Sequence, residues 1–224
     1  MTKTRAMDFY VIDHSPPDWR DRPITRFEES KAYRFADPPT CEACGGLLAE
    51  GCRWLGPYEA ELEVDGTEFG DMAFASLEGV LVSDRFRSAW EAEGMTGLEG
   101  FEAVRIYRVR PSSPTRLKEN PPPYWYAYVG DSPVYVLDDE SGVERETAVS
   151  CQTCRWADVR AYRRVVLDGS SWSGQDVFIP RNLPLFIASE RFRDFVTANS
   201  LVGIWLVPAE DYYFSHTESR WYPQ

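Results

Sequence analysis

The sequence predicts an α+β fold in which one unit, made of a CxxC knuckle, antiparallel strands and a short helix, is duplicated. Two observations predict it. The stretches "CEACGG" at 41–46 and "CQTCRW" at 151–156 each place two cysteines three positions apart. The stretches "LVSDRFRSAWEAEGMTGLEGF" from Leu81 and "IASERFRDFVTANSLVGIWL" from Ile187 both carry the pattern S-x-R-F-R. Similarity at a fixed spacing is typical of a repeated structural unit, so we expect two matching halves docked against each other.

We expect four consecutive segments within one compact domain. Residues 1–40 hold one strand, "FYVID" at 9–13, followed by irregular proline-rich chain. Residues 41–109 form the first unit, and residues 151–224 form the second unit with a C-terminal tail. Between them, residues 110–150 contain a proline-rich loop, because proline disfavours both helix and central strand. The same segment contains an inserted hairpin, in which "YWYAYV" and "VYVL" flank "GDSP".

Both units have the same expected order of elements. The knuckle leads into a strand, an Asp-Gly dipeptide forms a hairpin turn, and a second strand follows. A serine, Ser83 or Ser189, then caps a short helix. Apolar residues spaced as on one helix face predict a side packed on the core: Phe86, Ala89 and Trp90 in the first helix, and Phe192, Phe195 and Val196 in the second. Gly94 ends the first helix, and closing strands follow at 101–107 and 204–207.

Composition and charge exclude several classes of protein. The chain has 224 residues, of which 43% are hydrophobic, so it can bury a sizeable core. It contains no apolar run near the roughly 18 residues that indicate a membrane helix, and its first residues contain no apolar signal segment. We therefore expect a cytoplasmic protein without membrane contact. The formal net charge of −12 disfavours nucleic acid as a partner, because phosphate binding needs a basic surface.

The paired cysteines are the strongest chemical signal in the sequence. In a reducing compartment, paired cysteines more often bind metal or perform redox work than form disulfides. If the two halves meet, one tetrahedral site shared between them can hold structural Zn²⁺ through four thiolates. Its expected ligands are Cys41, Cys44, Cys151 and Cys154. A redox dithiol and thiols without a ligand stay open as alternatives.

No familiar catalytic motif is present. The chain has no GxSxG elbow, no Walker loop and no HExxH pair. A zinc ion held by four cysteines has no open coordination position, so we expect a structural role and no enzyme activity. A thiol enzyme that uses Cys52 or a CxxC pair stays open, although a partly buried thiol is the simpler reading of Cys52. The two histidines, His14 and His216, are expected to be surface or hydrogen-bonded loop residues.

Two CxxC motifs, one of them running "CEACG", in a chain of this length resemble the double-CXXCG family of myxobacterial paralogues. That family includes immunity proteins of Sit-type toxin systems, and the resemblance covers about residue 41 to the C-terminus. It implies a cytoplasmic immunity protein that binds and neutralises a cognate toxin, with a structural zinc. The sequence departs from the motif at Arg155, where the second motif would have glycine. The alternative function is that of a zinc-ribbon-like regulator or adaptor without catalytic activity.

Two acidic stretches are candidate contacts for a basic toxin. In "YEAELEVD" the acids alternate with apolar residues, which predicts a strand with one acidic face: Glu59, Glu61, Glu63 and Asp65. Neighbouring acids on one face repel each other, so a cationic partner must compensate them. That partner is either the toxin or the internal arginines Arg160, Arg163 and Arg164. The second stretch lies at the expected end of the inserted hairpin and consists of Asp138, Asp139 and Glu140.

Overall fold

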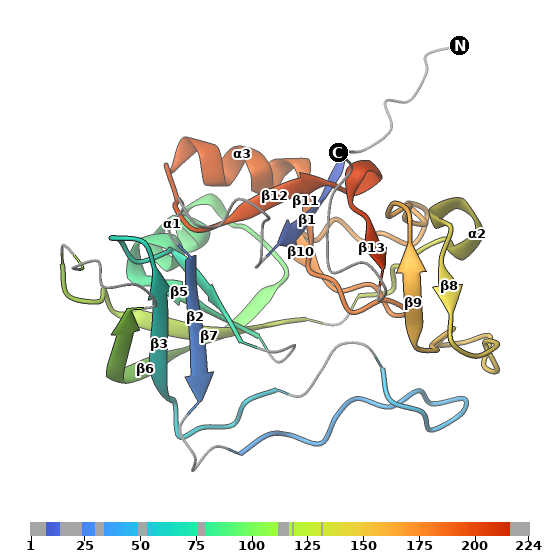
Figure 1. The fold of residues 1–224 in the computed structure, drawn as a ribbon, viewed down its shortest axis with the longest axis horizontal. Helices are drawn as coiled ribbons and strands as arrows, with labels where there is room; N and C mark the ends of the chain where they lie inside the picture. Colours follow the sequence, from blue (N-terminus) through green and yellow to red (C-terminus); the bar gives the residue numbers. More distant parts are fainter. Residues whose placement is uncertain are drawn as a thin grey trace.

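Six strands close into a β-barrel that forms one end of the molecule (Figure 1). The computed structural model describes residues 8–13, 24–29, 34–48, 53–75, 79–111, 117, 119–130 and 132–215. The barrel order is β2-β3-β6-β7-β5-β4, and the pairing of β2 with β4 completes the circle. Its strands are β2 (Ile24–Glu29), β3 (Glu59–Asp65), β4 (Met72–Phe74), β5 (Val80–Ser83), β6 (Leu98–Pro111) and β7 (Tyr124–Val129). Closure leaves no open strand edges, which would otherwise invite pairing with another chain.

Two smaller sheets continue the molecule away from the barrel (Figure 1). A four-stranded sheet has the order β10-β11-β1-β12, built from β10 (Val177–Phe178), β11 (Ile187–Ser189), β1 (Phe9–Asp13) and β12 (Trp205–Pro208). At the far end lies a three-stranded sheet of order β13-β9-β8, built from β13 (Phe214–Ser215), β9 (Val159–Tyr162) and β8 (Glu144–Arg145). We call this three-stranded sheet, the loop between β8 and β9, and the short helical turn before β8 the distal lobe. The N-terminal strand β1 is the element predicted at 9–13, and its bounds are confirmed.

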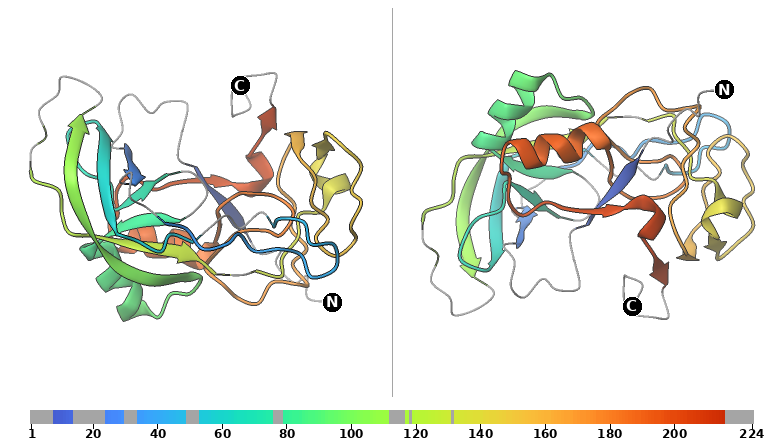
Figure 2. Two further views of the ribbon diagram at one scale, coloured as in Figure 1. Left: turned by 90° about the horizontal axis from the view of Figure 1, so that it is seen from below. Right: turned by 90° about the horizontal axis from the view of Figure 1, so that it is seen from above.

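Two helices pack against each other and against both the barrel and the central sheet. They are α1 (Asp84–Glu93) and α3 (Glu190–Ala198), which lie side by side (Figure 2). The rings of Phe86 and Trp90 from α1 meet those of Phe192 and Phe195 from α3, with centroids 5.5 to 6.3 Å apart. Aromatic pairs at this spacing contribute beyond the area that they bury. The predicted apolar faces of the two helices therefore meet in one shared core.

The local signals predicted for these two helices are confirmed. The hydroxyl oxygens of Ser83 and Ser189 accept hydrogen bonds from the backbone N–H three residues later, at 3.1 and 3.2 Å. Each serine thereby satisfies one of the N–H groups that a helix start leaves without an intrahelical partner. Gly94 ends α1 in the left-handed conformation, with φ of 60°. Among the described residues the third α-helix is the single turn α2 (Asp138–Ser141), and a 3-10 turn spans Ala209–Asp211.

The fold class predicted from the sequence is wrong. The described residues form a mostly β structure around a closed barrel with only three α-helices, whereas two matching α+β units were expected. The expected units fail because their strands pair outside them. Strand β2 comes from the N-terminal segment and pairs with both β3 and β4, so the Asp-Gly dipeptide after β3 joins no hairpin. The expected hairpin at 110–150 is absent as well, because β7 pairs with β5 and β6.

Within this different fold, two short segments nevertheless have the same order of elements: 71–97, of which the structure describes all but 76–78, and 176–203. The buried Asp71 precedes β4, and its carboxylate accepts a hydrogen bond from the Ser83 hydroxyl at 2.6 Å and forms an ion pair with Arg85. The same carboxylate accepts the backbone N–H of Val202 at 2.8 Å, in the loop after α3. Asp71 therefore joins its own helix start to the loop that follows the other helix.

Asp176 makes the corresponding set of contacts in the opposite direction. It is buried before β10, accepts the Ser189 hydroxyl at 3.0 Å and pairs with Arg191 at 2.7 Å. Its second oxygen accepts the backbone N–H of Thr96 at 2.9 Å, in the loop after α1. The two aspartates thus exchange contacts across the helix pair, and a buried carboxylate satisfied by several donors is a stable arrangement.

Candidate metal centre

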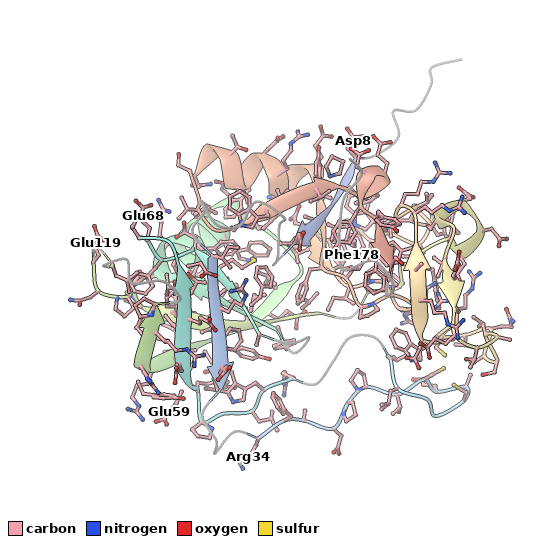
Figure 3. The ribbon with its side chains drawn as sticks, in the orientation of Figure 1. Asp8, Arg34, Glu59, Glu68, Glu119 and Phe178 are labelled. Carbon is pink, nitrogen blue, oxygen red and sulfur yellow. The ribbon has the colours of Figure 1, made fainter. Side chains whose placement is uncertain are left out.

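A long hairpin between β2 and β3 carries the first cysteine pair. We call residues 34–58 the arm; the structure describes all of it except 49–52. Backbone hydrogen bonds join its two sides from Arg34 and Gly56 at the base to Cys41 and Gly46 at the tip. The arm leaves the foot of the barrel and crosses the lower face of the molecule to the distal lobe (Figures 1 and 2). Arg34 and Glu59, labelled in Figure 3, mark where it leaves and rejoins the barrel.

The base of the arm is anchored in the barrel core. Trp54 is fully buried and packs against the rings of Phe27, Tyr58 and Tyr126, with centroids 5.2 to 6.3 Å apart. Its backbone N–H donates to the Tyr126 hydroxyl oxygen at 2.9 Å. Burial of a tryptophan supplies several kcal/mol, about 3 to 5 on the scale of truncation to alanine. The base of the arm is therefore fixed in the barrel, and this directs the tip toward the distal lobe.

The four cysteine sulfurs lie within 4.8 Å of one another at the tip of the arm. Cys41 Sγ is 3.9 Å from Cys151 Sγ, and Cys44 Sγ is 3.8 Å from Cys154 Sγ. Tetrahedral zinc with Zn–S bonds of about 2.3 Å places neighbouring sulfurs about 3.8 Å apart, whereas a disulfide needs about 2.05 Å. The four sulfurs are thus close enough together to hold one metal ion. In Figure 3, sulfur atoms gather where the arm meets the distal lobe.

The two knuckles have the same backbone geometry. The N–H of Gly45 donates to the Cys41 carbonyl at 2.7 Å, and the N–H of Arg155 donates to the Cys151 carbonyl at 2.9 Å. Both donors have left-handed backbones, with φ of 71° and 53°. The N–H of Gly46 donates to Cys44 Sγ at 3.4 Å. The departure of Arg155 from the glycine of the motif therefore leaves the shape of the second knuckle unchanged.

Protons are distributed unequally over the four sulfurs. Backbone N–H groups of Cys154 and Thr153 stabilise the thiolate of Cys151 and lower its pKa to about 6. The N–H of Gly46 acts in the same sense on Cys44, but neighbouring thiols, Cys151 first, outweigh it and raise the pKa of Cys44 to about 12. Burial raises the pKa of Cys154. A metal ion must therefore displace protons as it binds, and its affinity rises with pH.

The donor set restricts what the centre can hold and do. Four thiolates in tetrahedral order suit zinc or a thiolate-bound iron, and they are poor ligands for magnesium or calcium. With all four positions filled by protein, the ion has no place for water or substrate, so the site suits a structural role. Cys41 and Cys154 are buried and Cys44 is exposed, so the centre sits at the surface with one side in solvent. Cys52, His14 and His216 lie outside the described residues.

Sequence reasoning missed the residues that support the second knuckle. The Tyr135 hydroxyl donates to the carbonyl oxygen of Thr153, between the two cysteines, at 2.5 Å. The Arg155 guanidinium lies over the Tyr135 ring at 5.8 Å from its centroid. Tyr135 thus positions the loop of the second cysteine pair, and side chains of this kind orient metal ligands. The only signal in the sequence was an aromatic residue 16 positions before the first cysteine of the pair.

The negative charges of the acidic strand β3 are compensated by arginines of a neighbouring barrel strand. The ion pairs link Glu59 with Arg105, Glu61 with Arg108 and Arg110, and Glu63 with Arg110. These arginines belong to β6, the parallel neighbour of β3. They take the place of the internal partners expected from the sequence, Arg160, Arg163 and Arg164. Asp65 is buried and pairs with Arg26 at 2.8 Å. The buried Glu61 and Asp65 have little surface to offer a partner.

The second acidic stretch forms the short helix α2 on the distal lobe. Asp138 is held by Arg145, whose guanidinium donates to both carboxylate oxygens at 2.6 and 2.8 Å. Asn182 donates to the same carboxylate at 3.2 Å. Asp139 and Glu140 are exposed. Of the seven acids proposed as contacts, these two are the ones that lie fully at the surface among the described residues.

No family model matches the chain, and no curated protein matches it. Within the described residues, no helix has the length and apolar character that crossing a membrane requires. The chemistry of the four-cysteine centre is therefore the main guide to function.

Proposed function

We propose that the protein is a non-catalytic binding protein whose arm is stapled by structural Zn²⁺, and that it neutralises a cognate basic toxin in the cytoplasm. The zinc part is carried by one observation, the 3.8 and 3.9 Å spacing of sulfurs across the two knuckles. That spacing matches the edge of a ZnS₄ tetrahedron, about 3.8 Å. Zinc is favoured over iron because it needs no redox partner and is the usual ion of four-cysteine structural sites.

The metal assignment is tested by analysis of the purified protein. The expected result is one zinc per chain by elemental mass spectrometry after purification in reducing buffer. Replacing Cys41 or Cys151 by serine removes a ligand and should abolish stoichiometric binding. Cys52→Ser is the matched control, since Cys52 belongs to neither CxxC pair, and it should keep the metal. Iron in place of zinc would contradict the identity of the ion, and no bound metal would contradict the centre itself.

The toxin-neutralising role is supported by the net charge and by the resemblance of the paired motifs to immunity proteins. A charge of −12 favours encounter with a basic protein, because complementary fields accelerate association. A filled four-thiolate site agrees with a protein that acts by binding. The exposed acids Asp139 and Glu140 are the first contacts to test.

The test of this role is genetic. The gene next to this one is expressed in a naive bacterium, with and without the protein, and growth is followed. Toxicity that the protein relieves supports immunity, and the double change Asp139→Lys with Glu140→Lys should then weaken the relief. The matched control is Asp194→Lys, an exposed acid on α3 that lies on another element. Toxicity that the protein cannot relieve would contradict the pairing and favour the regulator or adaptor.

A further inference from the structure

The two ends of the arm are held in different ways. The base is fixed by Trp54 inside the barrel, as described above. The tip, residues 42–47, is exposed, and Leu47 is 55% exposed to solvent. None of the residues 36–48 belongs to the three apolar cores or to the partly buried residues packed against them. The tip therefore gains little from hydrophobic burial.

The thiols are the link between the tip and the rest of the protein. Between described residues, the hydrogen-bonding contacts of 36–48 with residues outside the arm are the two sulfur pairs, Cys41 with Cys151 and Cys44 with Cys154. Ion pairs between described residues likewise do not involve this stretch. Each sulfur pair joins one cysteine of the arm to one cysteine of the distal lobe. A metal bound by all four would join the arm to the distal lobe where no other hydrogen bond or ion pair between described residues does so.

We infer that the metal centre is a clasp: it holds the arm across the lower face of the molecule, and its loss releases the arm while the barrel and the helix pair stay folded. This inference rests on the proposed metal centre. It differs from the usual behaviour of small structural zinc domains, which unfold without metal because the ion supplies their folding free energy. Here the three cores are built without the arm tip, so they do not depend on the ion. Metal availability would then control whether the arm is closed or open.

Hydrogen exchange on the full chain tests the clasp directly. The zinc-loaded protein is compared with protein treated with a zinc chelator and a phosphine reductant. Amides of 36–48 and 151–156 should exchange about tenfold faster without metal, because their opening no longer requires breaking metal–thiolate bonds. Amides of β5, β7, α1 and α3 should keep their protection. Loss of protection throughout the chain would overturn the clasp while leaving the metal centre in place.

Proteolysis gives a second test, because the rate of cleavage at one position in the tip reports whether the arm is open. Glu42 is exposed and lies between the two cysteines of the arm, so a glutamate-specific protease can cut there once the tip opens. Cleavage after Glu42 should accelerate about tenfold on metal removal, because the rate follows the open population. The variant Cys151→Ser/Cys154→Ser, changed on the distal lobe only, should open the arm as fully as Cys41→Ser/Cys44→Ser.

The controls separate the clasp from the metal centre. The Cys52→Ser variant should be cleaved after Glu42 as slowly as the unchanged protein. The Glu42→Gln variant should not be cleaved at this position, which would identify the cleavage site. If the distal double variant left cleavage after Glu42 slow, the arm would be held by something other than the metal and the clasp would be wrong. If the unchanged protein bound no metal at all, both the clasp and the metal centre would be wrong.

Discussion

Arg155 illustrates how one residue can be locally unfavourable and still be accommodated. Its φ of 53° lies in the left-handed region, which costs a non-glycine residue about 1 to 2 kcal/mol. The matching position in the arm is Gly45, which adopts this conformation without that cost. The second knuckle has the same shape as the first. The conformational cost at Arg155 is therefore offset by the contacts around it, among them the contact of its guanidinium with the Tyr135 ring.

The strain at Arg155 predicts opposite effects for two substitutions. Arg155→Gly should keep or tighten zinc binding, by roughly fivefold if a strain of about 1 kcal/mol is relieved. Arg155→Val should weaken binding, because a β-branched residue tolerates this backbone poorly. Competition with a chromogenic chelator measures both affinities. Equal affinities for the two variants would mean that the backbone of the second knuckle carries no strain that bears on the metal.

The unequal protonation of the sulfurs predicts which cysteine reacts first in metal-free protein. The pKa of Cys151 is lowered to about 6, so at pH 7 it is mostly thiolate, the nucleophilic form. The pKa of Cys44 is raised to about 12, so Cys44 stays protonated although it is exposed. Iodoacetamide followed by peptide mass spectrometry should therefore label Cys151 before Cys44. The Cys151 rate should fall as the pH drops below about 6 and its thiolate takes up a proton. Faster labelling of Cys44 at pH 7 would contradict this order.

At the scale of elements, the crossed aspartates tie the two helices to each other's following loops. Asp71 and Asp176 each accept a hydrogen bond from the serine that caps the following helix and form an ion pair with an arginine of that helix. Each also accepts a hydrogen bond from a backbone N–H in the loop after the other helix. These are buried carboxylates whose acceptor sites are well satisfied, and removal of either leaves several donors without a partner. The helix pair therefore depends on polar contacts as well as on its aromatic core.

Truncation of either aspartate should destabilise the protein strongly. Asp71→Ala and Asp176→Ala are each expected to cost about 2 to 3 kcal/mol, because buried donors lose their acceptor. The two arginines are half exposed and can turn to water. Urea denaturation followed by circular dichroism gives the change in unfolding free energy. Asp194→Ala, at an exposed acid on α3, is the control and should have little effect. A change at Asp71 as small as at Asp194 would show that the crossed contacts do not stabilise the helix pair.

At the scale of the whole molecule, the net charge makes a prediction about association. A protein of charge −12 that binds a basic toxin should associate faster at low salt, because its field steers the encounter. Between 20 mM and 500 mM sodium chloride, the association rate should fall by roughly tenfold or more, since the Debye length shrinks with salt. Surface plasmon resonance with the toxin domain measures this rate. A rate that does not change with salt would remove the electrostatic support for a basic partner.

How much the sequence could predict depended on the range of the interactions. The helices at 84–93 and 190–198 were predictable because their capping serines and apolar faces are local signals. The clustering of the four cysteines was predictable from their spacing and from the expectation that distant loops meet. Strand partners were not, because pairing within a barrel joins residues far apart in the sequence and leaves no local mark.

Strand β6 is the clearest example of a strand whose partners could not be predicted from the sequence. Its arginines were not recognised as the partners of the acidic strand, because β3 and β6 pair in parallel and lie far apart in the chain. The stretch "YWYAYV" lies between β5 and β6 in the barrel wall, with half of its residues buried, and it was misread as half of a hairpin. Similarity between the helix segments suggested two whole units, although among the described residues the likeness in structure is limited to parts of 71–97 and 176–203.

The position of β1 in the central sheet constrains the order in which the chain can fold. This strand, at 9–13, pairs with β11 on one side and β12 on the other, so both partners lie nearly 200 residues later in the chain. During synthesis at about 5 to 20 residues per second, β1 waits roughly 10 to 40 s for its partners. The barrel strands are complete by residue 129 and can pair during that wait. The central sheet can close only after residues 187–208 have been made, well after the barrel strands are available.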